Sequence, residues 1–484
     1  MTELSKILSE VSETGSTWVK VEDQKTKDRD LVFRQTDDGT YATHKFFQTA
    51  EEKIARLTYA RIRTLPVPKE KVESLIRQYE TKNYIVLDIQ QKKAVFMMVS
   101  EKICILTGGP GTGKTSVLKA AFFVLKNLFP ASTTAFTAPT GKAARRITES
   151  AGFEASTIQK KIGDTGGNSL IQVLEDFLFI DEVSMLDVET MQKILCALSH
   201  RTRLILIGDV DQLPSVEPGA VLRDLVDCGL IPTINLTKTF RQDNESELFT
   251  NIQIVRNGME KKLIEGKEFI ILQKKDAFKV AAGRYLGNLK EFGKENVILL
   301  SPYRDGGTVN SYNFNNFFQS RLNKAPGVKT LQERNNETKE IEFRVNDPVI
   351  QLRNRDGIAN GDIGKVIYAR NGEVKVRYDD ITVFSYKGEE LEDLDLAYAM
   401  SVNKSQGSEY DCVIIPLLRE HTNINRNLIY TAITRAKKKV EIVTDDYSFI
   451  QEACKIQAAW ERKTFLAEEM AVAEKQCELL RQII

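Results

Sequence analysis

Residues 106–116 read LTGGPGTGKTS, which places glycines, a lysine and hydroxyl side chains at the spacing of a phosphate-binding loop. An apolar, strand-like segment precedes this loop and an amphipathic, helix-like segment follows it. Glycines allow backbone N–H groups to close around phosphates at the start of a helix. We expect Lys114 to reach the β- and γ-phosphates and the Thr115 hydroxyl to bind Mg²⁺. The residues expected to contact the nucleotide here are Gly108, Gly109, Pro110, Gly111, Thr112, Gly113, Lys114, Thr115 and Ser116.

A second strand-like segment ends in two carboxylates, within FLFIDEVSMLD at residues 177–187. Asp181 is suited to bind Mg²⁺ directly or through water, and Glu182 can orient or deprotonate an attacking water molecule. An acidic pair after an apolar run is by itself more often a solvated turn. The phosphate-binding loop upstream favours the functional interpretation, with Thr115 and Asp181 as the metal-binding side chains.

A third strand-like segment, ILIGDVDQLPSV at residues 205–216, also opens into a polar loop. The ends of strands in open α/β sheets are where such proteins place their ligands. Together, the three segments indicate a nucleoside triphosphatase. They fit a transporter ATPase, a GTPase, a kinase or a helicase equally well.

Composition narrows the class of protein without deciding it. The 484 residues suggest about two to four domains. The formal charge of +1 means that binding to nucleic acid would depend on local basic clusters. We find no apolar run long enough for a membrane span and no signal-peptide pattern at the start. We therefore expect a cytoplasmic protein with reduced cysteines, which are Cys104, Cys196, Cys228, Cys412, Cys454 and Cys477.

Short apolar strands alternate with amphipathic helices in two parts of the chain, which predicts two α/β domains with parallel sheets. Between the two pieces of the second domain, short alternating strands with Asn-Gly and Asp-Gly turns predict a small β-barrel. The expected limits are 1–80 for an N-terminal accessory domain, 81–230 for the first α/β domain, 231–325 with 395–450 for the second, 326–394 for the barrel and 451–484 for a C-terminal helix.

Basic and hydroxyl side chains cluster in FTAPTGKAARRI at residues 136–147. A helix N-terminus followed by Lys142, Arg145 and Arg146 could track a sugar–phosphate backbone. The same three cations could equally form a solvated helix face. Tyr303, further along the chain, could be a nucleic-acid contact or simply a tyrosine of the core or of a turn.

The order of the motifs makes a family resemblance visible. Beyond those already quoted, the chain contains TFRQ (239–242), LSPYR (300–304), NGDIG (360–364), VNKSQGSE (402–409) and YTAITRAK (430–437). In this order, the set resembles the RecD-like DNA helicases, superfamily 1B enzymes that move 5′→3′. The resemblance extends from about Leu87 to Val443. It implies two RecA-like P-loop domains, an SH3-like barrel within the second domain, and an N-terminal accessory domain.

The resemblance also implies roles for particular residues. Gln91 would contact adenine, Gly407 and Glu409 would lie near the nucleotide, and Gln212 would sense the γ-phosphate. Arg241 and Arg435 would act as arginine fingers. The DNA-binding residues would be Pro139, Thr140, Lys142, Arg145, Tyr303, Asn403 and Lys404.

The chain departs from the family pattern at two motifs and in one loop. Asn403 and the TIQK stretch at residues 157–160 replace the histidines that the family commonly has. Their amides can still donate hydrogen bonds, but they stack less well on bases. The strand-separating pin would be a short hairpin at about 161–176.

The leading hypothesis is an ATP-dependent DNA translocase and helicase that uses Mg²⁺ and acts on single-stranded and tailed duplex DNA in repair, recombination or replication. An alternative is a weakly motor-active, ATP-regulated subunit of a larger recombination or exonuclease complex. Protein partners could then dock on the N-terminal domain or on the C-terminal helix. A transport or signalling ATPase is the third hypothesis, and the motifs at 402–409 and 430–437 argue against it.

Overall fold

The computed structural model describes the chain in seven stretches, and within them it divides into two compact units. Unit 1 comprises Met1–Pro139, Ala143–Arg241 and Ala458–Ile484, and unit 2 comprises Thr140–Lys142 and Gln242–Gln457. In the described stretches, no helix has the length and apolar character that crossing a membrane requires. The described residues are 3–22, 28–163, 170–240, 246–334, 337–355, 358–378 and 382–483.

The N-terminal region is a small sheet with a helix on either side in the sequence. Its three strands pair antiparallel in the order β1-β3-β2. Ile7 and Val11 of helix α1 pack against apolar side chains of these strands and make a small core. The elements are α1 (Glu3–Thr14), β1 (Val19–Val21), β2 (Leu31–Thr36), β3 (Gly39–His44) and α2 (Lys45–Tyr59).

Unit 1 is built around a six-stranded sheet in which all strands run parallel, in the order β6-β5-β7-β8-β4-β9. Three of these strands are the strand-like segments expected before the phosphate-binding loop, before the acidic pair and in residues 205–216. The strand β9 also belongs to this sheet, because it pairs with β4. It lies beyond residue 230, so unit 1 extends past the point where we expected the second domain to begin. The strands are β4 (Ile103–Gly108), β5 (Thr134–Ala138), β6 (Ala155–Thr157), β7 (Phe177–Ile180), β8 (Arg203–Gly208) and β9 (Thr233–Leu236).

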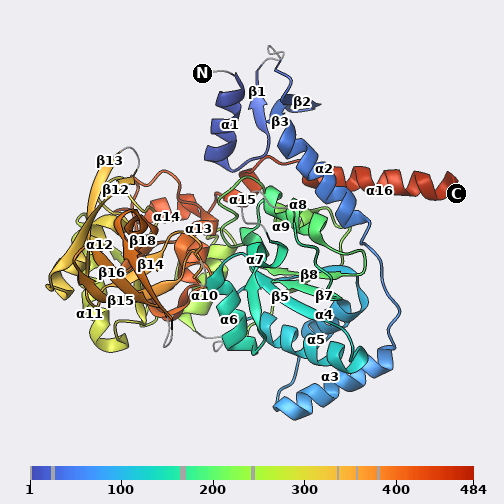
Figure 1. Ribbon diagram of the computed structural model, residues 1–484, viewed down its shortest axis with the longest axis horizontal. Coiled ribbons are helices and arrows are strands. Elements are labelled where there is room, and N and C mark those ends of the chain that lie inside the picture. The colour runs from blue at the N-terminus through green and yellow to red at the C-terminus, as the bar shows by residue number, and fades with distance from the viewer. Residues whose placement is uncertain are drawn as a thin grey trace. The chain divides into compact units, whose positions relative to one another are not determined.

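Helices cover both faces of this sheet (Figure 1). Along β4, Ile103 and Ile105 pack into one core, whereas Cys104 and Leu106 pack into the other, as the two-residue repeat of a strand dictates. Below the sheet in the view lie α4 and α5, and above it lie α8 and α9. The helices are α3 (Lys69–Asn83), α4 (Ile89–Ser100), α5 (Lys114–Leu128), α6 (Gly141–Ala151), α7 (Ile158–Ile162), α8 (Val188–Ala197) and α9 (Val221–Asp227).

Unit 2 contains a second parallel sheet of five strands, in the order β10-β21-β20-β11-β19. Strand β11 is fully buried and β20 almost fully, which explains their continuous apolar sequences. The strands are β10 (Phe269–Gln273), β11 (Val297–Ser301), β19 (Ala399–Ser401), β20 (Tyr410–Leu417) and β21 (Ala436–Thr444), and the helices are α10 (Glu247–Arg256), α11 (Ala277–Phe292), α12 (Ser311–Leu322), α13 (Arg426–Ile433) and α14 (Tyr447–Ala453).

Between α12 and β19 the chain is antiparallel. A hairpin of β12 and β13 is followed by a five-stranded sheet in the order β17-β16-β15-β14-β18. The turn from β15 to β16 is Asn371–Gly372, and both residues have positive φ, as a two-residue hairpin turn requires. The strands are β12 (Gly327–Arg334), β13 (Glu337–Arg344), β14 (Pro348–Gln351), β15 (Ile363–Arg370), β16 (Glu373–Arg377), β17 (Val383–Lys387) and β18 (Leu394–Leu396).

The C-terminal segment, which we expected to be one helix over 451–484, contains the end of α14, the short α15 (Ala458–Glu461) and α16 (Leu466–Ile483). Helical hydrogen bonding stops between α15 and α16 because the backbone there bonds elsewhere. The Lys463 N–H donates to the Ser16 hydroxyl at 3.0 Å, and the Lys463 carbonyl accepts from the Thr17 N–H at 3.0 Å. Helix α16 then packs beside α2 (Figure 1).

Candidate active site

The phosphate-binding loop connects β4 to α5 and depends on glycine at positions where the backbone has positive φ. Gly111 has φ +74° and Gly113 has φ +85°. A Cβ atom on Gly113 would also lie 2.3 Å from Nε2 of Gln91, so a side chain there is excluded twice. The Gln91 amide donates to the Thr112 carbonyl at 3.2 Å. The predicted adenine contact therefore lies against the loop itself.

Gln91 is held in place by the first turn of α4. The Asp88 carboxylate accepts from the Gln91 N–H at 2.8 Å, and the Gln91 side-chain oxygen accepts from the Asp88 N–H at 3.1 Å, which is a capping box. The sequence LDIQ thus begins helix α4 and also places the buried Gln91 amide against the phosphate-binding loop.

The Lys114 ammonium lies inside the loop that it is predicted to serve. It donates to the carbonyl oxygens of Gly108 and, at 3.1 Å, of Gly109. The Thr112 hydroxyl also donates to the Gly109 carbonyl, at 2.8 Å. These bonds keep the ammonium at the mouth of the loop, where a phosphate oxygen could replace the carbonyl groups as its partner.

The acidic pair follows β7. Glu182 adopts a left-handed backbone conformation with φ +55°, and its N–H donates to the Asp181 carboxylate at 2.9 Å. Burial and the neighbouring Glu182 charge raise the pKa of Asp181 to about 6, while the charges of Lys114 and Arg146 oppose that rise. Arg146 of α6 lies 4.0 Å from the Glu182 carboxylate. Two adjacent carboxylates, one of them with a raised pKa, fit a divalent cation.

The loop after β8 buries its polar residues. Asp209 and Gln212 are 1% and 5% exposed. The Gln212 N–H donates to the Asp209 carbonyl at 3.2 Å, and its side-chain amide approaches the Asp209 carboxylate at 3.4 Å. The carboxylate also accepts from the Asp211 N–H at 3.1 Å. Asp209 therefore organises the turn that presents Gln212.

Strand order brings these groups to one edge of the sheet. Because β8 lies between β7 and β4 and all three run parallel, their carboxyl ends meet there. A Cβ atom on Gly208 would lie 3.3 Å from the Ser184 nitrogen, in the turn after the acidic pair. The phosphate-binding loop, the acidic pair and the Gln212 loop thus form one continuous edge in unit 1.

Unit 2 brings together the other residues predicted to face the nucleotide. Arg435 is 3% exposed, and its guanidinium donates to the Thr431 carbonyl at 3.0 Å and to the Thr434 hydroxyl at 3.2 Å. The Arg435 carbonyl accepts from the Tyr410 N–H at 2.8 Å, so the backbone next to Glu409 adjoins Arg435. Gly407 is buried with φ +74°.

Known proteins match this chain in both units. A family model described as an AAA domain matches residues 86–277, and one described as the UvrD-like helicase C-terminal domain matches residues 396–443. The protein named ATP-dependent RecD2 DNA helicase, from Deinococcus radiodurans, is 32% identical over 361 residues, which are 73% of this chain. The chain is similar to RecD-like helicases over 73% of its length.

Other RecD-like proteins match over similar lengths. The RecBCD enzyme subunit RecD of Mycolicibacterium smegmatis is 29% identical over 404 residues, covering 73% of this chain and 70% of that protein. The chain spans about half the length of the Deinococcus relative, 48%. A solved structure of Pif1 helicases at forked DNA aligns with 77% of this chain and 94% of its own, at a TM-score of 0.49 and 20% identity.

The predicted DNA-binding residues of this RecD-like chain lie in separate elements. Pro139 and Thr140 follow β5, and Lys142 and Arg145 are half-buried residues in the first turns of α6. In unit 2, Asn403 is exposed and Lys404 is half-buried on a single turn of 3₁₀ helix.

Tyr303, which follows β11, has a clear structural role. Its hydroxyl accepts from the Asn423 N–H at 3.1 Å and lies 3.2 Å from the Thr422 hydroxyl. Its ring meets the His421 ring edge-on, with centroids 5.0 Å apart. These contacts fit the turn-tyrosine interpretation, and they leave its role at DNA a prediction.

Two predictions fall on parts of the chain outside the described residues. Arg241 is one of them, although the N–H of its neighbour Phe240 donates to the Gly111 carbonyl at 2.8 Å. The backbone that leads to Arg241 thus reaches the phosphate-binding loop. The middle of the predicted pin, 164–169, is the other. On its two sides, the Ile171 N–H donates to the Ile162 carbonyl at 2.8 Å.

Sequence reasoning assigned no role to two residues that organise this edge. Asp209 was visible in the sequence as part of a polar strand end, but nothing marked it as the residue that holds Gln212. Arg462 was not marked at all. Its guanidinium donates to the Ser215 and Gly219 carbonyls, each at 2.7 Å, although it lies far along the chain from both.

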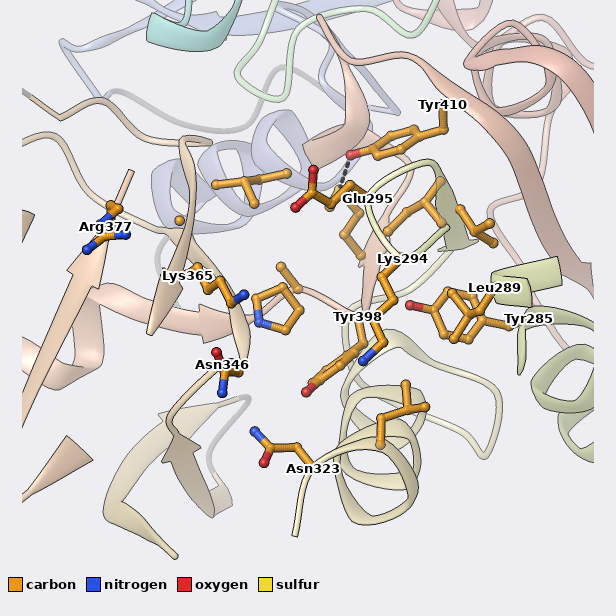
Figure 2. Close-up of a pocket in the computed structure, with 18 of the residues that line it drawn as sticks. Tyr285, Leu289, Lys294, Glu295, Asn323, Asn346, Lys365, Arg377, Tyr398 and Tyr410 are labelled. Atoms are coloured by element: carbon orange, nitrogen blue, oxygen red, sulfur yellow. Dashed lines mark hydrogen bonds between the residues drawn. The ribbon is translucent and has the colours of Figure 1, made fainter. Parts of the chain in front are cut away.

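A cavity of about 650 Å³ lies elsewhere, within unit 2, between the second parallel sheet and the antiparallel strands (Figure 2). Tyr285 and Lys294 line one side, and Lys365 and Arg377 line the other. The predicted nucleotide- and DNA-binding residues that the structure describes do not line this cavity.

Proposed function

We propose that this chain is an ATP-dependent DNA helicase that moves 5′→3′ along single-stranded DNA. The observation that carries the proposal is the single sheet edge in unit 1 at which the phosphate-binding loop, Asp181 with Glu182, and Gln212 meet. The relatives support DNA as the partner, since the protein from Deinococcus radiodurans is named an ATP-dependent RecD2 DNA helicase. The direction rests on the resemblance to the RecD-like class.

In this proposal the backbone of the phosphate-binding loop holds the phosphates, and Lys114 exchanges its carbonyl partners for phosphate oxygens. Thr115 and Asp181 would hold Mg²⁺, which neutralises charge on the phosphates when bound. The raised pKa of Asp181 supports this, because a group whose charge is poorly compensated gains most from a cation. Glu182, oriented by its left-handed backbone, would place the attacking water.

Arg241 and Arg435 would stabilise the γ-phosphate in the transition state. The Arg435 guanidinium donates to the Thr431 and Ser408 carbonyls and to the Thr434 hydroxyl. Its planar fork of N–H donors matches the oxygens of a phosphate, which is why arginine suits this role. Glu409 and Gly407, in the neighbouring backbone, would face the ribose.

We also propose the finer architecture that the family resemblance implies. The antiparallel strands of residues 327–396 would be an SH3-like barrel, with the bulge between Val366 and Tyr368 as a point where the sheet curves. The region before α3 would be the accessory domain, and residues about 161–176 a short pin. We place the protein in the cytoplasm, and suggest the accessory domain and α16 as surfaces for protein partners.

The decisive test is ATP turnover by the isolated chain with and without single-stranded DNA. We expect strong stimulation by DNA, and a Lys114→Ala variant gives the background. Turnover that DNA does not change would contradict a DNA motor. Absence of turnover in a folded, ATP-binding chain would favour the alternative, an ATP-regulated subunit.

A further inference from the structure

The loop that follows Gln212 is fastened by a residue from the other end of the chain. Within this 215–219 loop, the Ser215 hydroxyl donates to the Glu217 carbonyl at 2.7 Å. The Arg462 guanidinium spans the loop. One nitrogen donates to the Gly219 carbonyl at 2.7 Å and approaches the Ser215 hydroxyl at 3.2 Å, and the other donates to the Ser215 carbonyl at 2.7 Å. Arg462 thus joins the two ends of the loop.

The segment that carries Arg462 is fastened in return by the helix after the loop. We call residues 462–465 the strap. Arg223 of α9 donates to the Arg462 carbonyl at 3.1 Å and to the Thr464 hydroxyl at 2.7 Å. One arginine therefore runs from the strap to the loop, and another runs from the helix after the loop back to the strap.

The N-terminal region closes the same network. The Gly219 N–H donates to the Gly15 carbonyl at 2.8 Å, and the Lys463 N–H donates to the Ser16 hydroxyl at 3.0 Å. Gly15 has φ +69°, and a Cβ atom on it would lie 2.4 Å from the Arg462 guanidinium carbon. The chain is thus built to let the guanidinium lie against the backbone at Gly15.

The N–H groups of the Arg462 guanidinium donate hydrogen bonds that hold the 215–219 loop in one shape. Burial first, and then the nearby Arg223 charge, lower the pKa of Arg462 to about 10, so it stays charged at neutral pH. Its guanidinium donates to carbonyl and hydroxyl oxygens of the 215–219 loop. Desolvating a guanidinium is costly, and several hydrogen bonds to one loop repay that cost only while the loop keeps this shape.

We propose that Arg462 is a positioning residue for ATP turnover, holding the 215–219 loop so that Gln212 keeps its place at the nucleotide edge and responds to DNA. The inference rests on the proposed function. In physical terms, a change at Gln212 can alter DNA binding only if the loop transmits it rather than absorbing it. The strap supplies that stiffness, and it links the accessory domain to the same loop.

The chain offers a matched control in Arg61. Arg61 is buried where Arg462 is half-buried, and it likewise donates to backbone carbonyls, those of Leu57 at 3.1 Å, Leu198 at 3.3 Å and Ser199 at 3.4 Å. It contacts neither the strap nor the 215–219 loop in these bonds. Arg61→Ala therefore reports what loss of a buried, carbonyl-bound arginine does to stability alone.

The experiment measures kcat and KM for ATP, with and without single-stranded DNA, together with the melting temperature, in the wild type, Arg462→Ala, Arg462→Lys and Arg61→Ala. We expect Arg462→Ala to lower the stimulation of kcat by DNA about fivefold or more, the lower end of typical coupling. Arg462→Lys keeps the positive charge but lacks the paired N–H donors of the guanidinium. Its stimulation by DNA should therefore lie between those of the wild type and Arg462→Ala. Arg61→Ala should lower the melting temperature and keep the stimulation of the wild type.

Each other result overturns a stated claim. If the wild type is stimulated and both Arg462 variants match it, Arg462 positions nothing. If Arg61→Ala loses as much stimulation as Arg462→Ala, the effect is general destabilisation and the inference fails. If Arg462→Ala does not fold, Arg462→Lys decides between these outcomes. A wild type that DNA does not stimulate overturns the proposed function itself.

Discussion

Two loops of unit 1 meet the same sheet edge but are built in opposite ways. The phosphate-binding loop takes its shape from consecutive residues, with glycines at positive φ and Lys114 bonded to carbonyls five and six residues before it. The 215–219 loop takes its shape from Arg462 and Gly15, which are remote in sequence. A loop shaped by its own consecutive residues has a recognisable sequence motif, whereas a loop held by residues remote in sequence has none. Function can depend on both.

The largest expected effect lies in the locally built loop. Lys114→Ala should abolish ATP turnover, because no other cation in the loop can reach the phosphates, yet it should leave single-strand binding largely intact. Turnover assays and DNA-binding titrations check this. Hydrolysis at the normal rate by this variant would show that Lys114 and its loop do not bind the phosphates.

The next effect concerns the arginine fingers. Arg241→Ala and Arg435→Ala should each slow hydrolysis by roughly 10³–10⁵-fold, the usual contribution of such residues. Arg435 also donates to backbone carbonyls of Thr431 and Ser408, so thermal melting must show that each variant remains folded. Single-turnover hydrolysis and thermal melting measure the two effects. A loss below about tenfold for both variants would place these side chains outside the transition state.

A smaller effect is expected at Gln212, where the two kinds of loop meet. Gln212→Ala should keep ATP binding and lose roughly 5–150-fold of the coupling between DNA and hydrolysis. If Gln212 only braces its turn through Asp209, the variant should instead melt earlier and keep its stimulation ratio. Melting temperature and the ratio of rates with and without DNA distinguish the two roles.

The last of these predictions concerns stability and not turnover, in the region whose shape depends on residues remote in sequence. Glu51 is fully buried beside the strap, where it accepts from the Thr17 hydroxyl at 2.5 Å and the Trp18 indole at 2.9 Å. Burial raises its pKa to about 8, against the hydrogen bonds that lower it. The folded state therefore holds a proton that the unfolded chain releases, and stability falls as pH rises from about 4.5 to about 8.

Glu51→Gln should remove that dependence, because an amide has the shape of the protonated acid and does not titrate. The contribution to the free energy of unfolding should be of the order of a few kcal/mol across the window, at about 1.4 kcal/mol per pKa unit. Urea unfolding at pH 5 and at pH 8 measures it. An equal slope in both proteins would mean that Glu51 does not carry the proton.

Strands could be predicted from the sequence where nearly all of their side chains are buried. Strands β4, β7 and β8 are fully or almost fully buried and read as apolar runs, so they were expected with their polar ends. Strand β6 is only three half-buried residues, AST, and carries no such signal. Strand β9 was assigned beyond the first domain because its pairing with β4 depends on a contact between distant segments.

The same limit applies to the site. Gln91, Lys114, Asp181 and Gln212 belong to motifs whose spacing reflects what each must reach. Arg462 lies in WERKTF, where a basic residue next to another on a charged segment looks like any solvated stretch. Its partners are backbone carbonyls, and carbonyl groups have no residue type that a sequence could reveal.

A helicase of this kind must move along DNA in one direction, and unwinding of duplexes that carry a single-stranded tail at one end measures that direction. With ATP and Mg²⁺, we predict that a duplex with only a 5′ tail is separated and that one with only a 3′ tail is not, while Lys114→Ala separates neither. Separation of the 3′-tailed duplex alone would mean that the chain moves in the opposite direction, 3′→5′. Separation of neither by a chain that hydrolyses ATP would contradict a helicase.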